Sequence, residues 1–258
     1  MFLWSPIATL LFNHGDVAAA ARVLDEAKRQ AETPVRRGLN TLHQLCEAYD
    51  LWDRFHHRDA RTRLLNVTKT PHDLMVWYPN SAYRLISTVE RHVRWLERLP
   101  HDCRAFVCDL LANADRCADR GRYDDGVARL YRACEAAAQF RLAELRLTDK
   151  PDGKVPYERL PEPLRTQWSS RLEDGLVRLG LQDDYALLNA VADPLGERFV
   201  QLGLNDRLHS PLNDRNNSIL AHGQAPLSIR GYTNLRDVLL SLLEVQPDDL
   251  PRYLVLKD

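Results

Sequence analysis

Gly121-Arg-Tyr-Asp-Asp-Gly126 has the composition of a turn and helix cap, and it leads into Val127-Ala-Arg-Leu-Tyr-Arg-Ala-Cys-Glu135. Glycine and aspartate favour turns and helix starts, so the stretch predicts a long helix over roughly residues 124–145.

Helical periodicity continues on both sides of this helix. After a cap at Asp16, apolar residues recur at three- and four-residue steps along Val17–Gln30. The same spacing predicts helices at 34–55, 80–99, 103–119, 164–179, 183–192, 194–204, 211–221 and 232–245. Prolines and a glycine between 148 and 163 predict a loop, and 252–256 has strand-like composition. We therefore predict an all-α protein with a boundary near residue 100.

The overall composition and charge limit the kinds of function that the chain can have. The 258 residues are 45% hydrophobic and 28% charged, as in ordinary globular proteins, and the net charge is −1. No overall basic field can attract nucleic acid, so any RNA must bind in a local groove. The five cysteines lack metal-ligand or disulfide spacing, which favours a reducing, cytoplasmic setting and no metal site. The apolar start, residues 1–12, is too short to span a membrane.

The stretch with candidate chemistry reads Ser210-Pro-Leu-Asn-Asp-Arg-Asn-Asn-Ser-Ile-Leu-Ala-His-Gly223. Arg215 and His222 are seven residues apart. On a helix this separation is a rotation of about 700° and a rise of about 10 Å, so both side chains lie on nearly the same face. Asn216 and Ser218 add polar groups nearby.

An arginine and a histidine held together suit the cleavage of RNA. RNA carries its own nucleophile, the 2′-hydroxyl beside the scissile phosphate. A histidine can move protons near neutral pH, and a fixed arginine can stabilise the charge that builds on the phosphate. Such a site needs no metal or other cofactor, and we expect none.

The Arg–His spacing alone does not indicate a catalytic site, because it also arises by chance. Arg36 and Arg37 precede His43 at similar distances, and Arg94 precedes His101. Among other basic residues, Arg132 on the long predicted helix either lines an RNA groove or pairs with Glu135 on the surface. The sequence leaves both roles open.

The extended string is more specific than its spacing. Arg215-Asn-Asn-Ser-Ile-Leu-Ala-His-Gly223 resembles the active-site motif of HEPN ribonucleases, in which a polar residue follows the arginine. It is most similar to the version in the ancillary ribonucleases of type III CRISPR systems. The long helix and the stretch Leu179-Gly-Leu-Gln-Asp-Asp-Tyr-Ala-Leu-Leu188 resemble the same family. The resemblance covers residues 100–245 well and the first hundred more loosely.

This resemblance implies a helical linker-like domain at 1–100 and a HEPN ribonuclease domain at 101–258, a helical bundle. Family members form homodimers in which both Arg/His sets share one composite cleft. They cut single-stranded RNA and leave 2′,3′-cyclic phosphate ends, in antiviral defence. Carried over to this chain, Arg215 stabilises the phosphate charge, His222 transfers protons or positions the phosphate, and Asn216 orients these groups. Ser218 and Arg132 are the candidate substrate-binding residues.

One departure from the family concerns its sensor. Full-length relatives begin with a Rossmann-like CARF domain that binds cyclic oligoadenylate. Strand and helix do not alternate in this sequence, so we expect any such domain to lie outside this chain. The chain is then either the effector half of a larger protein or a stand-alone HEPN protein. The alternative function is a non-catalytic HEPN binding, scaffold or toxin–antitoxin module.

Overall fold

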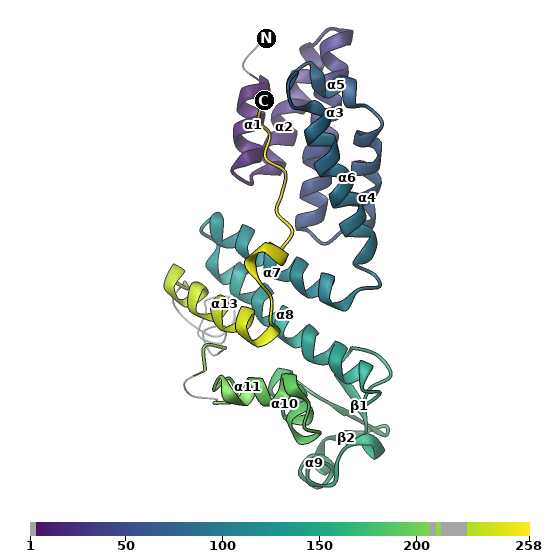
Figure 1. The fold of residues 1–258 in the computed structure, drawn as a ribbon, viewed down its shortest axis with the longest axis vertical. Coiled ribbons are helices and arrows are strands. Elements are labelled where there is room, and N and C mark those ends of the chain that lie inside the picture. The colour runs from purple at the N-terminus through teal and green to yellow at the C-terminus, as the bar shows by residue number, and fades with distance from the viewer. Residues whose placement is uncertain (1–3, 207–209, 213–225) are drawn as a thin grey trace. The chain divides into compact units, whose positions relative to one another are not determined.

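The computed structural model describes residues 4–206, 210–212 and 226–258. Within these residues helices predominate, and the regular β-structure is one three-stranded sheet, which confirms the predicted all-α class. The chain divides into two compact units (Figure 1). The first comprises Met1–Ala105 with Pro251–Asp258, and the second comprises Phe106–Leu250.

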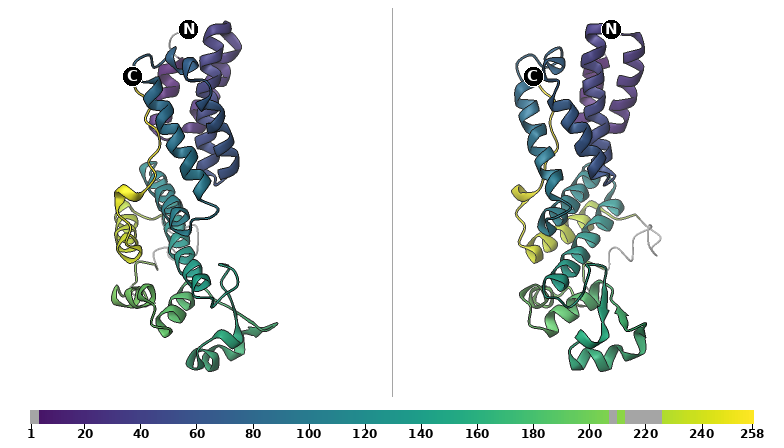
Figure 2. Two further views of the ribbon diagram at one scale, coloured as in Figure 1. Left: turned by 45° about the vertical axis from the view of Figure 1, so that its right-hand side comes forward. Right: turned by 90° about the vertical axis from the view of Figure 1, so that its right-hand side faces the viewer.

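The first unit is a helical bundle. Its helices are α1 (Trp4–Asn13), α2 (Val17–Gln30), α3 (Thr33–Asp53), α4 (His57–Thr68), α5 (Pro71–Met75) and α6 (Ala82–Arg98). Helix α3 packs against both α2 and α4, and α4 packs against α6 (Figure 2). The apolar positions that predicted α3 are buried, among them Leu42, Leu45 and Trp52. The helix ends where Phe55 takes a left-handed conformation with φ of 61°.

A buried aromatic cluster organises the core of this unit. The Tyr49 hydroxyl lies 2.6 Å from His92 Nδ1 on α6, and its ring stacks on Trp52. Tyr253 also belongs to the cluster, because its hydroxyl donates to Asp53 Oδ1 over 2.9 Å. This contact ties the end of the chain to the first unit.

The C-terminal segment Pro251–Asp258 packs with the first unit, whereas the sequence placed it with the second. Asn13 bonds the backbone of Leu256 in both directions, at 2.7 Å each, and Asn80 donates to the Asp258 carboxylate. The strand-like composition of 252–256 reflects this extended path, in which Leu254 and Leu256 enter the core.

The second unit is built around α8 (Tyr123–Glu144), the long helix that the opening stretch predicts. The other helices are α7 (Cys103–Asp119), which begins in the first unit, α9 (Glu162–Trp168), α10 (Leu181–Ala190), α11 (Pro194–Gln201) and α13 (Ile229–Leu243). Helices α10 and α13 both pack against α8, and α10 packs against α11. Short 3-10 turns lie at Tyr157–Arg159, Ser169–Arg171 and Pro247–Asp249.

A small antiparallel sheet interrupts this unit where the sequence predicted a loop and a helix. Its strands are β1 (Lys154–Pro156), β2 (Leu172–Glu173) and β3 (Leu176–Arg178), in the order β1-β3-β2. The helix predicted over 164–179 is therefore wrong beyond Trp168. Asp174 and Gly175, both with positive φ, form the two-residue turn between β2 and β3. An Asp-Gly pair is a strong hairpin signal, and it overrides the helical spacing here.

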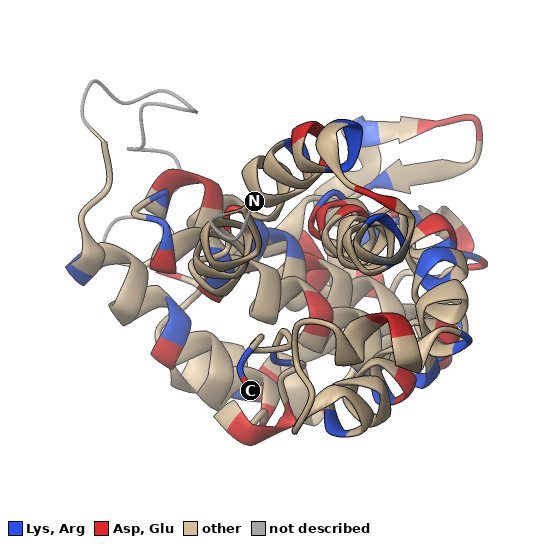
Figure 3. Cartoon of the chain, turned by 90° about the horizontal axis from the view of Figure 1, so that it is seen from above, with Lys and Arg blue, Asp and Glu red and all other residues tan. Residues whose placement is uncertain are grey.

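Charges of both signs are interspersed along the helices (Figure 3). Many are ion pairs within one helix, such as Arg141 with Glu144 and Arg132 with Glu135. This distribution agrees with the net charge of −1 and leaves electrostatic attraction of RNA to local features.

Candidate active site

The predicted catalytic motif lies outside the described residues. Arg215, Asn216, Ser218 and His222 all fall within 213–225, so their proposed sharing of one helix face stays a prediction. The structure does describe the residues on both sides of this segment.

Described residues just before the motif are buried, and the chain just after it is bonded to α8. Before it, Ser210 and Leu212 are buried, and the Leu212 amide donates to Ser210 Oγ over 3.2 Å. After it, the Leu227 amide donates to Asp124 Oδ2 over 3.2 Å, in the first turn of α8. Ser228 then caps α13 by accepting from the Gly231 amide. The flank that follows the motif is therefore anchored to α8.

A cluster around the Asp115 carboxylate fixes α13 against α7. Asp115 accepts from the Tyr232 hydroxyl over 2.5 Å and from Arg236 Nε and Nη2 over 2.6 and 2.9 Å. Burial and the adjacent carboxylate raise the pKa of Tyr232 far above its ordinary value, so it stays a donor. Gly126 of α8 lies against the Tyr232 ring, where a Cβ would meet ring carbon at 2.8 Å. These contacts hold α7, α8 and α13 together, close in sequence to the end of the motif.

We expect Asp115→Asn to destabilise the protein by about 1.5–3 kcal/mol, because it removes a charged acceptor of three hydrogen bonds. Asp237→Asn is the matched control, since Asp237 is exposed and lies 3.5 Å from the same arginine. The control should change the free energy of unfolding by less than about 0.5 kcal/mol. Urea unfolding of both variants measures the difference, and equal effects would contradict the role given to Asp115.

Arg132, the predicted substrate-binding residue that the structure describes, is part of a polar cluster on α8. Its Nη1 donates to Glu135 Oε2 and to Gln139 Oε1, at 3.1 Å each. The pairing with Glu135 that the sequence left open is therefore present, and 43% of the side chain remains exposed. RNA binding by Arg132 stays a prediction.

Asp184 of α10 lies next to this cluster and is fully buried. Neither of its oxygens has a hydrogen-bond partner within the described part of the chain. Burial, with the charges of Glu135 and Asp183, raises the pKa of Asp184 to about 8; Gln139 and Arg132 offset part of this effect. The carboxyl group is therefore protonated at neutral pH. The sequence did not single out Asp184, whose burial arises from the packing of α10.

The raised pKa predicts how stability depends on pH. In the unfolded chain Asp184 ionises near pH 3.9, whereas in the folded protein it keeps its proton up to about pH 8. Between these values only the unfolded state loses the proton, so this group lowers the free energy of unfolding as pH rises from about 4 to 8. Asp184→Asn, which mimics the protonated form, should remove the effect.

We expect the advantage of Asp184→Asn over the wild type to grow by up to about 1.4 kcal/mol for each pH unit in that window, and to level off above it. Urea unfolding at a series of pH values measures it. Asp149→Asn, at an exposed carboxylate, is the control and should differ little from wild type throughout. Parallel pH profiles for Asp184→Asn and the wild type would refute the buried-carboxyl account.

Within the described residues, no group of three histidine, cysteine, aspartate or glutamate side chains is placed to hold a metal ion. No helix in the same part of the chain is long and apolar enough to cross a membrane. None of the five cysteines, all of which the structure describes, forms a disulfide. Burial raises the pKa of the Cys46 and Cys134 thiols to about 12, so these two thiols are not activated nucleophiles.

A helical unit with a long central helix, and with an Arg-Asn…His string between α11 and α13, defines a protein of the HEPN class. Comparison with known families agrees: residues 96–246 match the family described as the Csm6 HEPN domain, and residues 6–96 match the Csm6 6H domain. The chain therefore belongs to the Csm6 family of CRISPR-associated HEPN nucleases, which confirms the resemblance inferred from the sequence. No curated protein matches the chain.

Proposed function

We propose that this chain is a metal-independent endoribonuclease that cuts single-stranded RNA in type III CRISPR antiviral defence. The observation that carries the proposal is the intact string from Arg215 through Asn216 to His222, which lies inside the matched HEPN span 96–246. A HEPN domain without catalysis would not need to keep all three residues.

The chemistry follows from what the side chains can do. Attack of the RNA 2′-hydroxyl on the adjacent phosphorus forms the 2′,3′-cyclic phosphate and breaks the bond to the 5′-oxygen of the next nucleotide. The proton leaves the attacking oxygen and another is delivered to the departing one, a role that suits His222. Arg215 stabilises the added negative charge on the phosphate, and Asn216 orients the reacting groups.

Two copies of the chain complete the proposed site. A single Arg215/His222 set supplies one cation and one proton carrier, whereas the reaction moves a proton at two oxygen atoms. In a homodimer the two sets meet in one composite cleft and supply both functions. Ser218 and Arg132 are proposed to contact the RNA, with the half-exposed Arg132 supplying local positive charge in a chain whose net charge is −1.

The direct test compares wild type with Arg215→Ala/His222→Ala on a fluorescent single-stranded RNA in the presence of EDTA. We expect the wild type to cut and the double variant to lose at least about 10²-fold in rate, because both proton transfer and charge stabilisation are removed. Thermal melting of the variant should match the wild type.

A second Arg–His pair with the same spacing provides the matched control. Arg94 and His101 are exposed, and Arg94→Ala/His101→Ala removes the same side chains without touching the motif. This control should cut at the wild-type rate. Loss of cutting in EDTA would rule out the metal-free mechanism, and absence of cutting by every protein would favour the non-catalytic HEPN module.

A further inference from the structure

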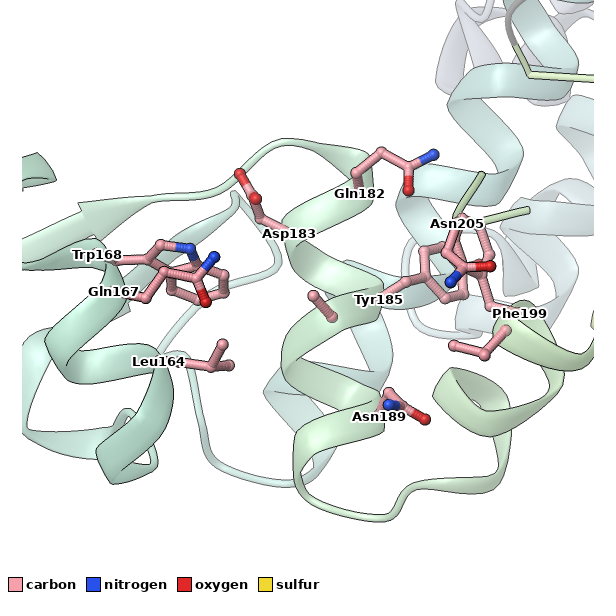
Figure 4. Close-up of a pocket in the computed structure, with 11 residues that line it drawn as sticks. Leu164, Gln167, Trp168, Gln182, Asp183, Tyr185, Asn189, Phe199 and Asn205 are labelled. Carbon is pink, nitrogen blue, oxygen red and sulfur yellow. The ribbon is translucent and has the colours of Figure 1, made fainter. Parts of the chain in front are cut away.

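A groove of about 270 Å³ lies in the second unit, across the outer face of α10. Figure 4 shows Leu164, Gln167 and Trp168 of α9 on one side of α10, and Phe199 and Asn205 on the other. Gln182, Ala186 and Asn189 of α10 follow one another at helical spacing and also line it. Because Ala186 has a small side chain, it leaves room at the middle of the groove.

The groove combines aromatic rings with side-chain amides. Trp168, Tyr185 and Phe199 form its apolar floor: all three rings are buried, and the last two stack on each other with centroids 3.9 Å apart. The amides of Gln167, Asn189 and Asn205 make no hydrogen bond within the described part of the chain, so their donors and acceptors are available to a ligand. Each amide offers both a donor and an acceptor, the combination that matches the edge of a nucleobase.

Charge argues against a phosphate as the group that enters. Among the lining residues that the structure describes there is no lysine or arginine, and the charged one is Asp183. The guanidinium of Arg171 donates to Asp183 Oδ2 over 2.8 Å and lies over the Trp168 ring. A neutral heterocycle with polar edges fits this lining, whereas an anion would meet a carboxylate. The volume is just below the 300–1,000 Å³ typical of ligand pockets, so it suits a single ring system.

We propose that this groove binds one nucleobase of the single-stranded RNA substrate, beside the scissile phosphate rather than at it. The inference rests on the proposed ribonuclease function and adds a site of base recognition to it. Asn205 precedes Arg215 by ten residues, and ten residues span at most about 36 Å, so one RNA strand can reach both places. Contacts of the base with the exposed amides and with the apolar floor then contribute to which RNA is held.

The test measures RNA binding by the full chain carrying Arg215→Ala/His222→Ala, so that the probe is not cut. The probes are short fluorescein-labelled oligomers of adenosine, uridine, cytidine or abasic ribose. Ala186→Phe fills the groove from its floor, and Val200→Trp fills it from the other wall; both positions are exposed, so folding should be preserved. Ala190→Phe, at an exposed alanine of the same helix outside the groove, is the matched control.

We expect each groove-filling substitution to weaken binding of at least one base-containing oligomer by about 5-fold or more, with binding of the abasic oligomer unchanged. Ala190→Phe should leave every affinity unchanged. Unchanged affinities in both folded groove variants, equal losses for the abasic probe, or no RNA binding by the parent protein would overturn the proposal. The assay measures binding and not cleavage. If the chain binds RNA but does not cut it, the groove-filling substitutions should still weaken binding of the base-containing oligomers.

Discussion

In the second unit, the carboxylate of Asp115 holds two helices together that are far apart in the sequence. Asp115 accepts hydrogen bonds from Tyr232 and Arg236, and so joins α13 to α7 across more than a hundred residues of chain. Asp124, one helix later, holds the Leu227 amide just before α13. The predicted catalytic motif lies between α11 and α13, so these two carboxylates determine where its C-terminal flank is anchored. The proposed nuclease site requires such anchoring, because small displacements of catalytic groups are costly.

Much of the helical fold could be predicted from the sequence, because apolar spacing directly determines which face is buried. Val17–Gln30 and Cys103–Asp119 are observed with the predicted bounds. The failures have local physical reasons. The Asp174-Gly175 turn produces a hairpin of β2 and β3 in place of the helix that the apolar spacing predicted. Strand β1, which pairs with β3, is too short to be recognised from the sequence alone. The return of Pro251–Asp258 to the first unit depends on contacts with Asn13 and Asn80, which no local pattern reveals.

The candidate site, like the fold, could be predicted from the sequence only in part. The Arg215…His222 string is visible in the sequence because its residue types are unusual together, and family membership supports its interpretation. Asp184 and the groove over α10 could not be predicted, because both arise from packing. A buried carboxyl with a pKa of about 8 requires knowledge of what surrounds α10, and the groove requires the positions of α9 and α11. Two of the proposed roles, proton transfer at the motif and base binding at the groove, thus rest on different kinds of observation.

The central claim is that RNA supplies the nucleophile and this chain supplies the protons and the cation. The most direct measurement is the mass of the fragments that the wild type produces from a single-stranded RNA, with a second substrate carrying one 2′-deoxynucleotide at the cleaved position. The account predicts 2′,3′-cyclic phosphate ends and no cutting at the deoxynucleotide. Fragments ending in a 3′-hydroxyl, or unchanged cutting at the deoxynucleotide, would contradict it.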